Sequence, residues 1–239
     1  MSYQNTFKRY EIKYLITEQQ MELLKELMYR YMLPDKFGKS IISNIYFDTP
    51  SKLLIRRSLE KPIYKEKLRV RSYGTATDDS TVFIELKKKY KGVVYKRRID
   101  MTYSNAKLWL CENNSPSKRS QIINEIDYFC NLYTGIEPSV FLYYEREAYF
   151  SKTDKNFRMT FDKNILWRDY DLTLSGSAYG KPLLKPNEIL LEIKSSDGFP
   201  LWLTDFLSKN QIFKTSFSKY GNAYKEMLTA AKLGGKISA

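Results

Sequence analysis

Charged side chains recur at every second position in four segments of the chain, and apolar residues fill most positions between them. The members are Arg9, Glu11 and Lys13; Lys67, Arg69 and Arg71; Glu85, Lys87 and Lys89; and Glu192 and Lys194. A period of two is typical of a β-strand, because its side chains alternate between the two faces. Such strands can turn their charged sides to water, or they can close around a charged interior that would admit a polyanion.

The basic members of these segments suit phosphate chemistry. Lys67, Arg69 and Arg71 share one face of an expected strand with no carboxylate between them, and Lys96 and Arg98 repeat the offset further along the chain. Guanidinium forks and ammonium groups bind phosphate oxygens, so neighbouring cations on several strands could bind successive phosphates. A solvated basic strand face is the alternative, and the repetition across strands favours phosphate binding.

Three glutamates stand among these cations. Glu11, Glu85 and Glu192 each precede a lysine by two positions. Each carboxylate is either a salt-bridge partner that neutralises an empty cavity or an oxygen ligand for Mg²⁺ or Mn²⁺ between phosphates. Phosphoryl transfer needs mainly such positioning and charge neutralisation, and it requires no covalent protein group.

The composition narrows the partners and the chemistry. The 239 residues carry a formal net charge of +13, which points to an anionic partner. Histidine is absent, which excludes a phosphohistidine, a histidine general base and a His-ligated metal. Cys111 and Cys130 lack metal-ligand spacing and are expected to be reduced thiols, which favours a cytoplasmic location. No window is long and apolar enough to cross a bilayer, so no integral membrane segment is expected.

Periodicity and turn residues predict the elements that must position these side chains. The expected strands are residues 7–16, 41–48, 64–73, 81–89, 93–101, 138–150, 156–163 and 188–195. The expected helices are a helix capped by Thr17 that ends before Pro34, and residues 50–59, 103–112, 120–133, 201–209 and 220–231. The pattern predicts one α+β domain over residues 1–239: an antiparallel β-barrel that forms a charged tunnel, with peripheral helices and a flexible tail after about residue 232.

Short motifs occur in a specific order along nearly the whole chain. They are Arg-Tyr-Glu-Ile-Lys at 9–13, Ile-Tyr-Phe-Asp-Thr at 45–49, Lys-Leu-Arg-Val-Arg at 67–71, Glu-Leu-Lys at 85–87, Tyr-Lys-Arg-Arg at 95–98, Tyr-Glu-Arg-Glu-Ala-Tyr at 144–149, Phe-Arg-Met-Thr-Phe-Asp at 157–162, Leu-Glu-Ile-Lys at 191–194 and Phe-Ser-Lys-Tyr at 217–220. With these motifs in this order, the sequence resembles the VTC (vacuolar transporter chaperone) domain. This domain is the polyphosphate polymerase branch of the triphosphate tunnel metalloenzyme (CYTH-like) superfamily.

The resemblance implies a basic tunnel that grips polyphosphate or a nucleoside triphosphate, with Mn²⁺ or Mg²⁺ held by a glutamate on a late strand. Glu192 matches that position, and Glu11 and Glu85 are the further metal-ligand candidates. With Lys67 and Arg98 added from the charge pattern, the expected phosphate-binding residues are Lys13, Lys67, Arg69, Arg71, Lys87, Lys96, Arg98, Arg146, Arg158, Lys194, Ser218 and Lys219. The expected catalytic residues are Lys13, Arg69, Arg71 and Glu192.

The leading functional hypothesis is a polyphosphate polymerase-like phosphotransferase that moves the terminal phosphoryl group of ATP onto a polyphosphate chain. In the resemblance, Arg9 stands where tunnel hydrolases and cyclases of the superfamily usually have the first glutamate of Glu-x-Glu-x-Lys. Because Arg9 replaces a potential metal ligand with a cation, it supports the polymerase branch. A tunnel-type triphosphatase or polyphosphatase and a non-catalytic polyphosphate- or RNA-binding module are the alternatives. ATP and polyphosphate, or another polyanion, are the expected partners, nucleic acid is not favoured, and a membrane-associated partner protein is compatible with the resemblance.

Overall fold

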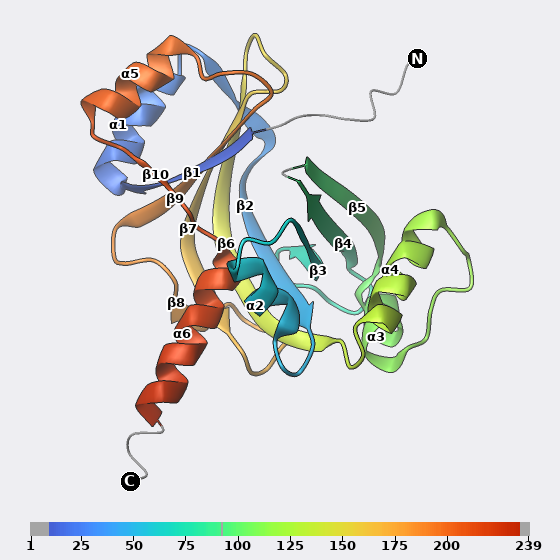
Figure 1. Cartoon of the computed structure of the whole chain (residues 1–239). Helices are drawn as coiled ribbons and strands as arrows, with labels where there is room; N and C mark the ends of the chain where they lie inside the picture. Colours follow the sequence, from blue (N-terminus) through green and yellow to red (C-terminus); the bar gives the residue numbers. More distant parts are fainter. Residues whose placement is uncertain (1–9, 92, 235–239) are drawn as a thin grey trace. The chain divides into compact units, whose positions relative to one another are not determined.

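The computed structural model describes residues 10–91 and 93–234, and Figure 1 shows its helices and strands. The chain forms two compact units. Unit 1 comprises Met1–Ile41, Tyr144–Ile165 and Leu184–Phe217, and unit 2 comprises Ile42–Tyr143, Leu166–Leu183 and Ser218–Ala239. The predicted roles of residues 7–9, which include Arg9, and of the tail after residue 234 lie outside the described residues.

The chain has mixed α and β structure. The strands are β1 (Tyr10–Thr17), β2 (Met32–Asp48), β3 (Tyr64–Tyr73), β4 (Thr81–Tyr90), β5 (Val93–Thr102), β6 (Glu137–Ser151), β7 (Arg158–Arg168), β8 (Lys181–Pro182), β9 (Glu188–Ser195) and β10 (Lys214–Thr215). The helices are α1 (Glu18–Met28), α2 (Leu53–Leu59), α3 (Tyr103–Glu112), α4 (Gln121–Leu132), α5 (Leu201–Lys209) and α6 (Lys219–Gly234). The predicted α+β class is confirmed.

Strong periodicity or clear end signals predicted several elements to the residue. The strands β3 and β9 and the helices α3 and α5 have the predicted bounds. The prediction was wrong for β2, which begins at Met32 instead of residue 41. The helix was predicted to extend toward Pro34, because proline ends a helix. A strand, however, tolerates proline where no neighbouring strand pairs with it on one side. The ladder between β2 and β3 covers only Ile42–Phe47, so Pro34 lies outside it. The two-residue strands β8 and β10 were not predicted, because two residues carry no period.

The sheet is antiparallel and has ten strands, of which β2, β6 and β7 run through both units. The hydrogen-bonded order is β10-β1-β9-β7-β6-β2-β3-β4-β5, and β8 pairs with β7. Among the described residues no ladder joins β10 to β5, so hydrogen bonds do not close the sheet into a barrel. Among the same residues, no helix is both long enough and apolar enough to span a membrane.

In unit 1, one face of the sheet carries the core. Met21 and Leu24 of α1 and Leu203 of α5 pack with Tyr14 of β1 and Ile193 of β9. Figure 1 shows α1 and α5 next to each other beside this part of the sheet. The predicted Thr17 cap is confirmed: its hydroxyl accepts from Gln20 N at 3.1 Å, and the Gln20 side chain accepts from Thr17 N at 3.0 Å.

In unit 2, the apolar faces of β3, β4 and β5 pack against α3 and α4 (Figure 1). The core includes Leu68 and Val70 of β3, Ile84 of β4, and Trp109 and Ile126 of the helices. The residues at the alternate positions, which include Arg69, Glu85 and Arg98, therefore lie on the opposite face, because strand side chains alternate. The predicted alternation is confirmed for each unit.

Candidate phosphate-binding site

The charged face of unit 2 is built by the register of β3, β4 and β5. Arg69 lies opposite Glu85, which lies opposite Arg98 on the next strand. One step further, Lys67, Lys87 and Lys96 form a second row across the same strands. Directly opposed residues of an antiparallel sheet point to the same side, so the predicted cations of these three strands share one face.

More charges extend this face beyond the expected phosphate-binding residues. Lys65 lies opposite Lys89, which continues the basic rows, and Asp100 lies opposite Phe83 at the other end. On β3, β4 and β5 the face thus has eight cationic side chains and two carboxylates. Burial lowers the pKa of Lys65, and the neighbouring Lys89 and Lys87 lower it further. The contribution of the two lysines reflects the like charges that surround Lys65 on this face.

Glu85 is the buried centre of the basic face, with 1% of its side chain exposed. Arg69 donates from Nε to Oε2 at 2.7 Å, and its second guanidinium contact with that oxygen is 2.6 Å. Lys96 Nζ lies 2.6 Å and Arg98 Nε 3.7 Å from Oε1, while Arg71 Nε lies 4.0 Å from Oε2. Burial alone would raise the pKa of the Glu85 carboxyl, but Arg69 and the other cations lower it to about 2.

Two residues of β2 hold the arginines, and the sequence analysis missed both. The Tyr46 hydroxyl accepts from Arg69 Nη1 at 2.8 Å, and Asn44 Oδ1 accepts from Arg71 Nε at 2.9 Å. Each is the direct cross-strand neighbour of its arginine. Asn44 and Tyr46 are two positions apart in β2 and therefore lie on one face of the strand, but only the register shows which arginine each one contacts.

Ser218 and Lys219 lie at the start of α6. The Ser218 hydroxyl is 3.3 Å from Lys67 Nζ and accepts from Gly221 N at 3.1 Å, so it caps the helix and contacts the basic face. The next residue but one, Tyr220, donates to the buried Asp48 carboxylate at 2.8 Å. Burial raises the pKa of Tyr220, and Asp48 raises it further, so the phenol remains a donor.

The charged face of unit 1 has a different arrangement, centred on Lys13. Its Nζ lies 3.1 Å from Glu11 Oε1 and 3.6 Å from Glu192 Oε2, and it donates to Phe217 O at 3.1 Å. Lys194 Nζ lies 2.5 Å from Glu192 Oε1. The register explains the cluster, because Lys13 is opposite Glu192 and Glu11 is opposite Lys194.

The other predicted cations of unit 1 are paired with carboxylates. Arg146 binds Asp162 in a bidentate manner, with contacts of 2.6 and 2.7 Å, and the Asp162 side chain is fully buried. Burial alone would lower the pKa of Arg146, but Asp162 raises it overall. Arg158 Nη2 lies 2.7 Å from Asp35 Oδ2. A phosphate that binds either guanidinium must therefore compete with a carboxylate.

Comparison with known protein families identifies the family of this chain. A model of the VTC domain family matches residues 8–228. The chain belongs to the VTC domain family. The resemblance drawn from its motifs is confirmed. No curated protein matches this VTC domain.

One solved structure supports the fold of this VTC domain, and a second is similar to a lower degree. A Bacillus halodurans protein, provisionally described as an adenylate cyclase, aligns with a TM-score of 0.54 at 15% identity and covers 87% of this chain and 92% of its own. A provisionally described adenylyl cyclase from Hippeastrum, said to have a dominant triphosphatase activity, aligns with a TM-score of 0.49 at 16% identity, with coverage of 88% and 92%. At 15% identity, the alignment with the Bacillus halodurans protein shows that the two chains share a fold.

The carboxylates of the VTC domain differ in their fitness for a divalent cation. Glu11 and Glu192 both lie within 3.6 Å of one cationic centre, the ammonium of Lys13, so two carboxylates already converge on a positive charge. Mg²⁺ and Mn²⁺ are commonly held by one or two carboxylates together with phosphate oxygens, and this pair fits that pattern. Glu85 fits it less well, since four cations lie within 4.0 Å of its oxygens, whereas Glu192 has the ammonium groups of Lys13 and Lys194 beside it and shares Lys13 with a second carboxylate. Among the described residues no group of three acidic or cysteine ligands converges.

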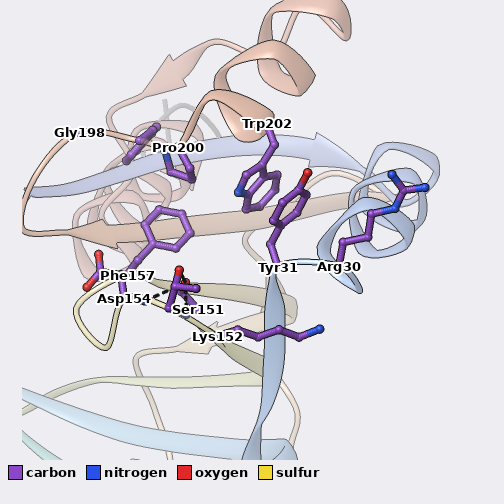
Figure 2. Close-up of a pocket in the computed structure, with 11 residues that line it drawn as sticks. Arg30, Tyr31, Ser151, Lys152, Asp154, Phe157, Gly198, Pro200 and Trp202 are labelled. Atoms are coloured by element: carbon purple, nitrogen blue, oxygen red, sulfur yellow. Dashed lines mark hydrogen bonds between the residues drawn. The ribbon is translucent and has the colours of Figure 1, made fainter.

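A pocket of about 440 Å³ lies elsewhere in unit 1. Figure 2 shows the stacked rings of Tyr31 and Trp202 with Phe157 beside them. The two stacked ring centroids are 4.8 Å apart. Arg30 and Lys152 supply positive charge near its rim, but none of the predicted phosphate-binding or metal-binding residues lines this pocket. The predicted phosphate-binding and metal-binding residues therefore lie outside this pocket.

Proposed function

We propose that this VTC domain is a metal-dependent phosphotransferase that moves the terminal phosphoryl group of ATP onto a polyphosphate chain. The observation that carries the proposal is the excess of cations over carboxylates on β3, β4 and β5. Such a surface favours a ligand with many closely spaced negative charges. Membership of the VTC family supports the same substrate class.

Phosphate binding falls mainly to the basic face of unit 2. Arg69 and Arg71 are held by the side chains of β2, so their guanidinium groups are already oriented for phosphate oxygens. Lys67, Lys87 and Lys96 form the adjacent row and would take the next phosphate along a chain. Oriented cations lose little conformational entropy on binding, which favours a linear polyphosphate.

The transfer step itself needs no protein nucleophile. A terminal oxygen of the polyphosphate forms a bond to the γ-phosphorus of ATP, the bond from that phosphorus to the bridging oxygen breaks, and the electron pair leaves with ADP. The arginines and lysines hold both phosphate groups in line and neutralise their charge, which lowers the barrier. On the charged face of unit 1, a divalent cation held by Glu192 and Glu11 would supply charge neutralisation to phosphate oxygens bound by Lys13 and Lys194 of the same face.

A product analysis tests this proposal. Purified protein is incubated with ATP and Mn²⁺, polyphosphate is resolved on a gel, and ADP and orthophosphate are quantified. The proposal predicts long chains and ADP with little orthophosphate. Orthophosphate without chains would establish hydrolysis instead, and binding of tripolyphosphate without either product would establish a binding module.

A further inference from the structure

Thr160 occupies the middle of the charged face of unit 1. It is the direct partner of Glu192 in the β7-β9 ladder, and Glu192 is the direct partner of Lys13 in the β9-β1 ladder. These three side chains therefore form one row on the same face. Directly opposed residues have Cβ atoms about 5 Å apart, so the Thr160 hydroxyl is within reach of the Glu192 carboxylate after a side-chain rotation.

The Thr160 hydroxyl is a buried polar group without a partner. The residue is 7% exposed, and its Oγ1 has no hydrogen-bond partner among the described residues. Such groups are uncommon in folded proteins, because an unsatisfied buried hydroxyl is unfavourable. Valine would fill the same volume without this penalty. The hydroxyl thus points to a partner that another state of the site provides.

The neighbouring carboxylate shows which partner this is. Glu192 Oε1 lies 2.5 Å from Lys194 Nζ, and Oε2 lies 3.6 Å from Lys13 Nζ. Both lysines are expected phosphate-binding residues. A phosphate chain would compete with Glu192 for their ammonium groups, and a carboxylate that loses cationic partners needs new ones.

We propose that Thr160 is a positioning residue for Glu192 in the ligand-bound site. When phosphate takes the ammonium groups of Lys13 and Lys194, the Thr160 hydroxyl donates a hydrogen bond to one oxygen of Glu192. The other oxygen is then directed to the divalent cation that accompanies the phosphate. This inference rests on the proposed function and adds a residue, with a role, to its metal site.

The test compares Thr160→Val, which keeps the shape and removes the hydroxyl, with Thr160→Ser, which keeps the hydroxyl. Calorimetric titration with imidotriphosphate, a hydrolysis-resistant triphosphate, gives the Kd in EDTA and in Mn²⁺, and their ratio measures how much Mn²⁺ tightens binding. We expect Thr160→Val to lower this ratio about tenfold, because second partners of metal ligands affect metal affinity on that scale. Its Kd in EDTA should stay within about twofold of the wild type, and its Tm should be unchanged or higher, since it removes an unsatisfied hydroxyl.

Thr160→Ser should retain most of the Mn²⁺ effect. A wild-type ratio in Thr160→Val, or an equal loss in both variants, would overturn the role of the hydroxyl. Glu192→Gln separates this failure from failure of the proposed function. If Glu192→Gln loses the Mn²⁺ effect while Thr160→Val keeps it, the metal site stands and the inference is wrong. If Glu192→Gln keeps the full effect, both the inference and the assigned metal site are wrong.

Discussion

The charged faces of the two units differ in how their cations are neutralised. In unit 1, the four predicted cations Lys13, Lys194, Arg146 and Arg158 each contact a carboxylate, and four carboxylates, Glu11, Glu192, Asp162 and Asp35, supply these contacts. On β3, β4 and β5 of unit 2, eight cations share the face with two carboxylates. Balanced charge suits exchange of partners, whereas excess positive charge suits retention of a polyanion.

This difference divides the two kinds of carboxylate that the sequence pattern could not separate. Glu85 and Glu192 both precede a lysine by two residues, and both are buried. Glu85 neutralises the cations that surround it, and this favours the role of salt-bridge partner. Glu192 stands beside a second carboxylate, Glu11, across Lys13, and this favours the role of metal ligand. Their substitution should therefore have different consequences.

Substitution of Glu192 should give the largest effect on activity. Glu192→Gln keeps the shape but removes the charge that attracts a divalent cation, so turnover of ATP with Mn²⁺ should fall by about 10²-fold or more. The affinity for polyphosphate in EDTA should persist or increase, because a negative charge has left a site for an anion. Parallel measurement of ATP consumption and of polyphosphate affinity checks both statements. Undiminished turnover would show that the metal is held elsewhere.

Substitution of Glu85 should instead act mainly on stability. Glu85→Gln leaves Arg69, Lys96 and their neighbours without their shared anion, and we expect a loss of about 3 kcal/mol in the free energy of unfolding. Tripolyphosphate should restore much of the lost Tm, since it replaces the missing negative charge. Sulfate at matched ionic strength is the control. An equal rescue by sulfate would argue against a site built for several linked phosphates.

The parts of this arrangement that were predictable are those fixed by local period. Alternation along β3 and β4 placed Arg69 and Glu85 on charged faces, because the side of a strand follows from position alone. The partners of these residues depend on register between distant segments. Tyr46, Asn44 and Thr160 are polar but uncharged, so the charge pattern gave no signal for them.

The dependence of partners on strand register also explains why the pairing of Arg146 was not predicted. The family resemblance implied a phosphate-binding arginine at this position, and the structure shows a bidentate pair with the buried Asp162 of another strand. Asp162 is the last residue of the Phe-Arg-Met-Thr-Phe-Asp motif at 157–162, but a contact between strands cannot be read from one strand. Whether Arg146 also contacts phosphate stays a prediction.

Two adjacent lysines of β4 offer a matched test of the basic face. Lys87 points to the charged face, and Lys88 points to the opposite side, where its Nζ lies 3.6 Å from Glu125 Oε2. Lys87→Ala should weaken tripolyphosphate binding about tenfold, because it removes a charge-assisted contact. Lys88→Ala changes the net charge equally and should weaken binding by less than about twofold. Equal losses, measured as Kd in EDTA at constant salt, would mean that only overall charge matters.

The smallest expected effect concerns pH and follows from the depressed pKa of Glu85. The folded-state pKa of about 2 lies below the ordinary value of 4.5, so the carboxylate stabilises the folded state above pH 4.5 and loses this contribution as the pH falls toward 2. The difference in unfolding free energy between wild type and Glu85→Gln should therefore be constant from about pH 5 to 8, and it should shrink only below about pH 4.5. Denaturant titrations of both proteins across this range measure the difference. A difference that already shrinks between pH 7 and 5 would show that Glu85 binds its proton far more readily than the surrounding cations allow.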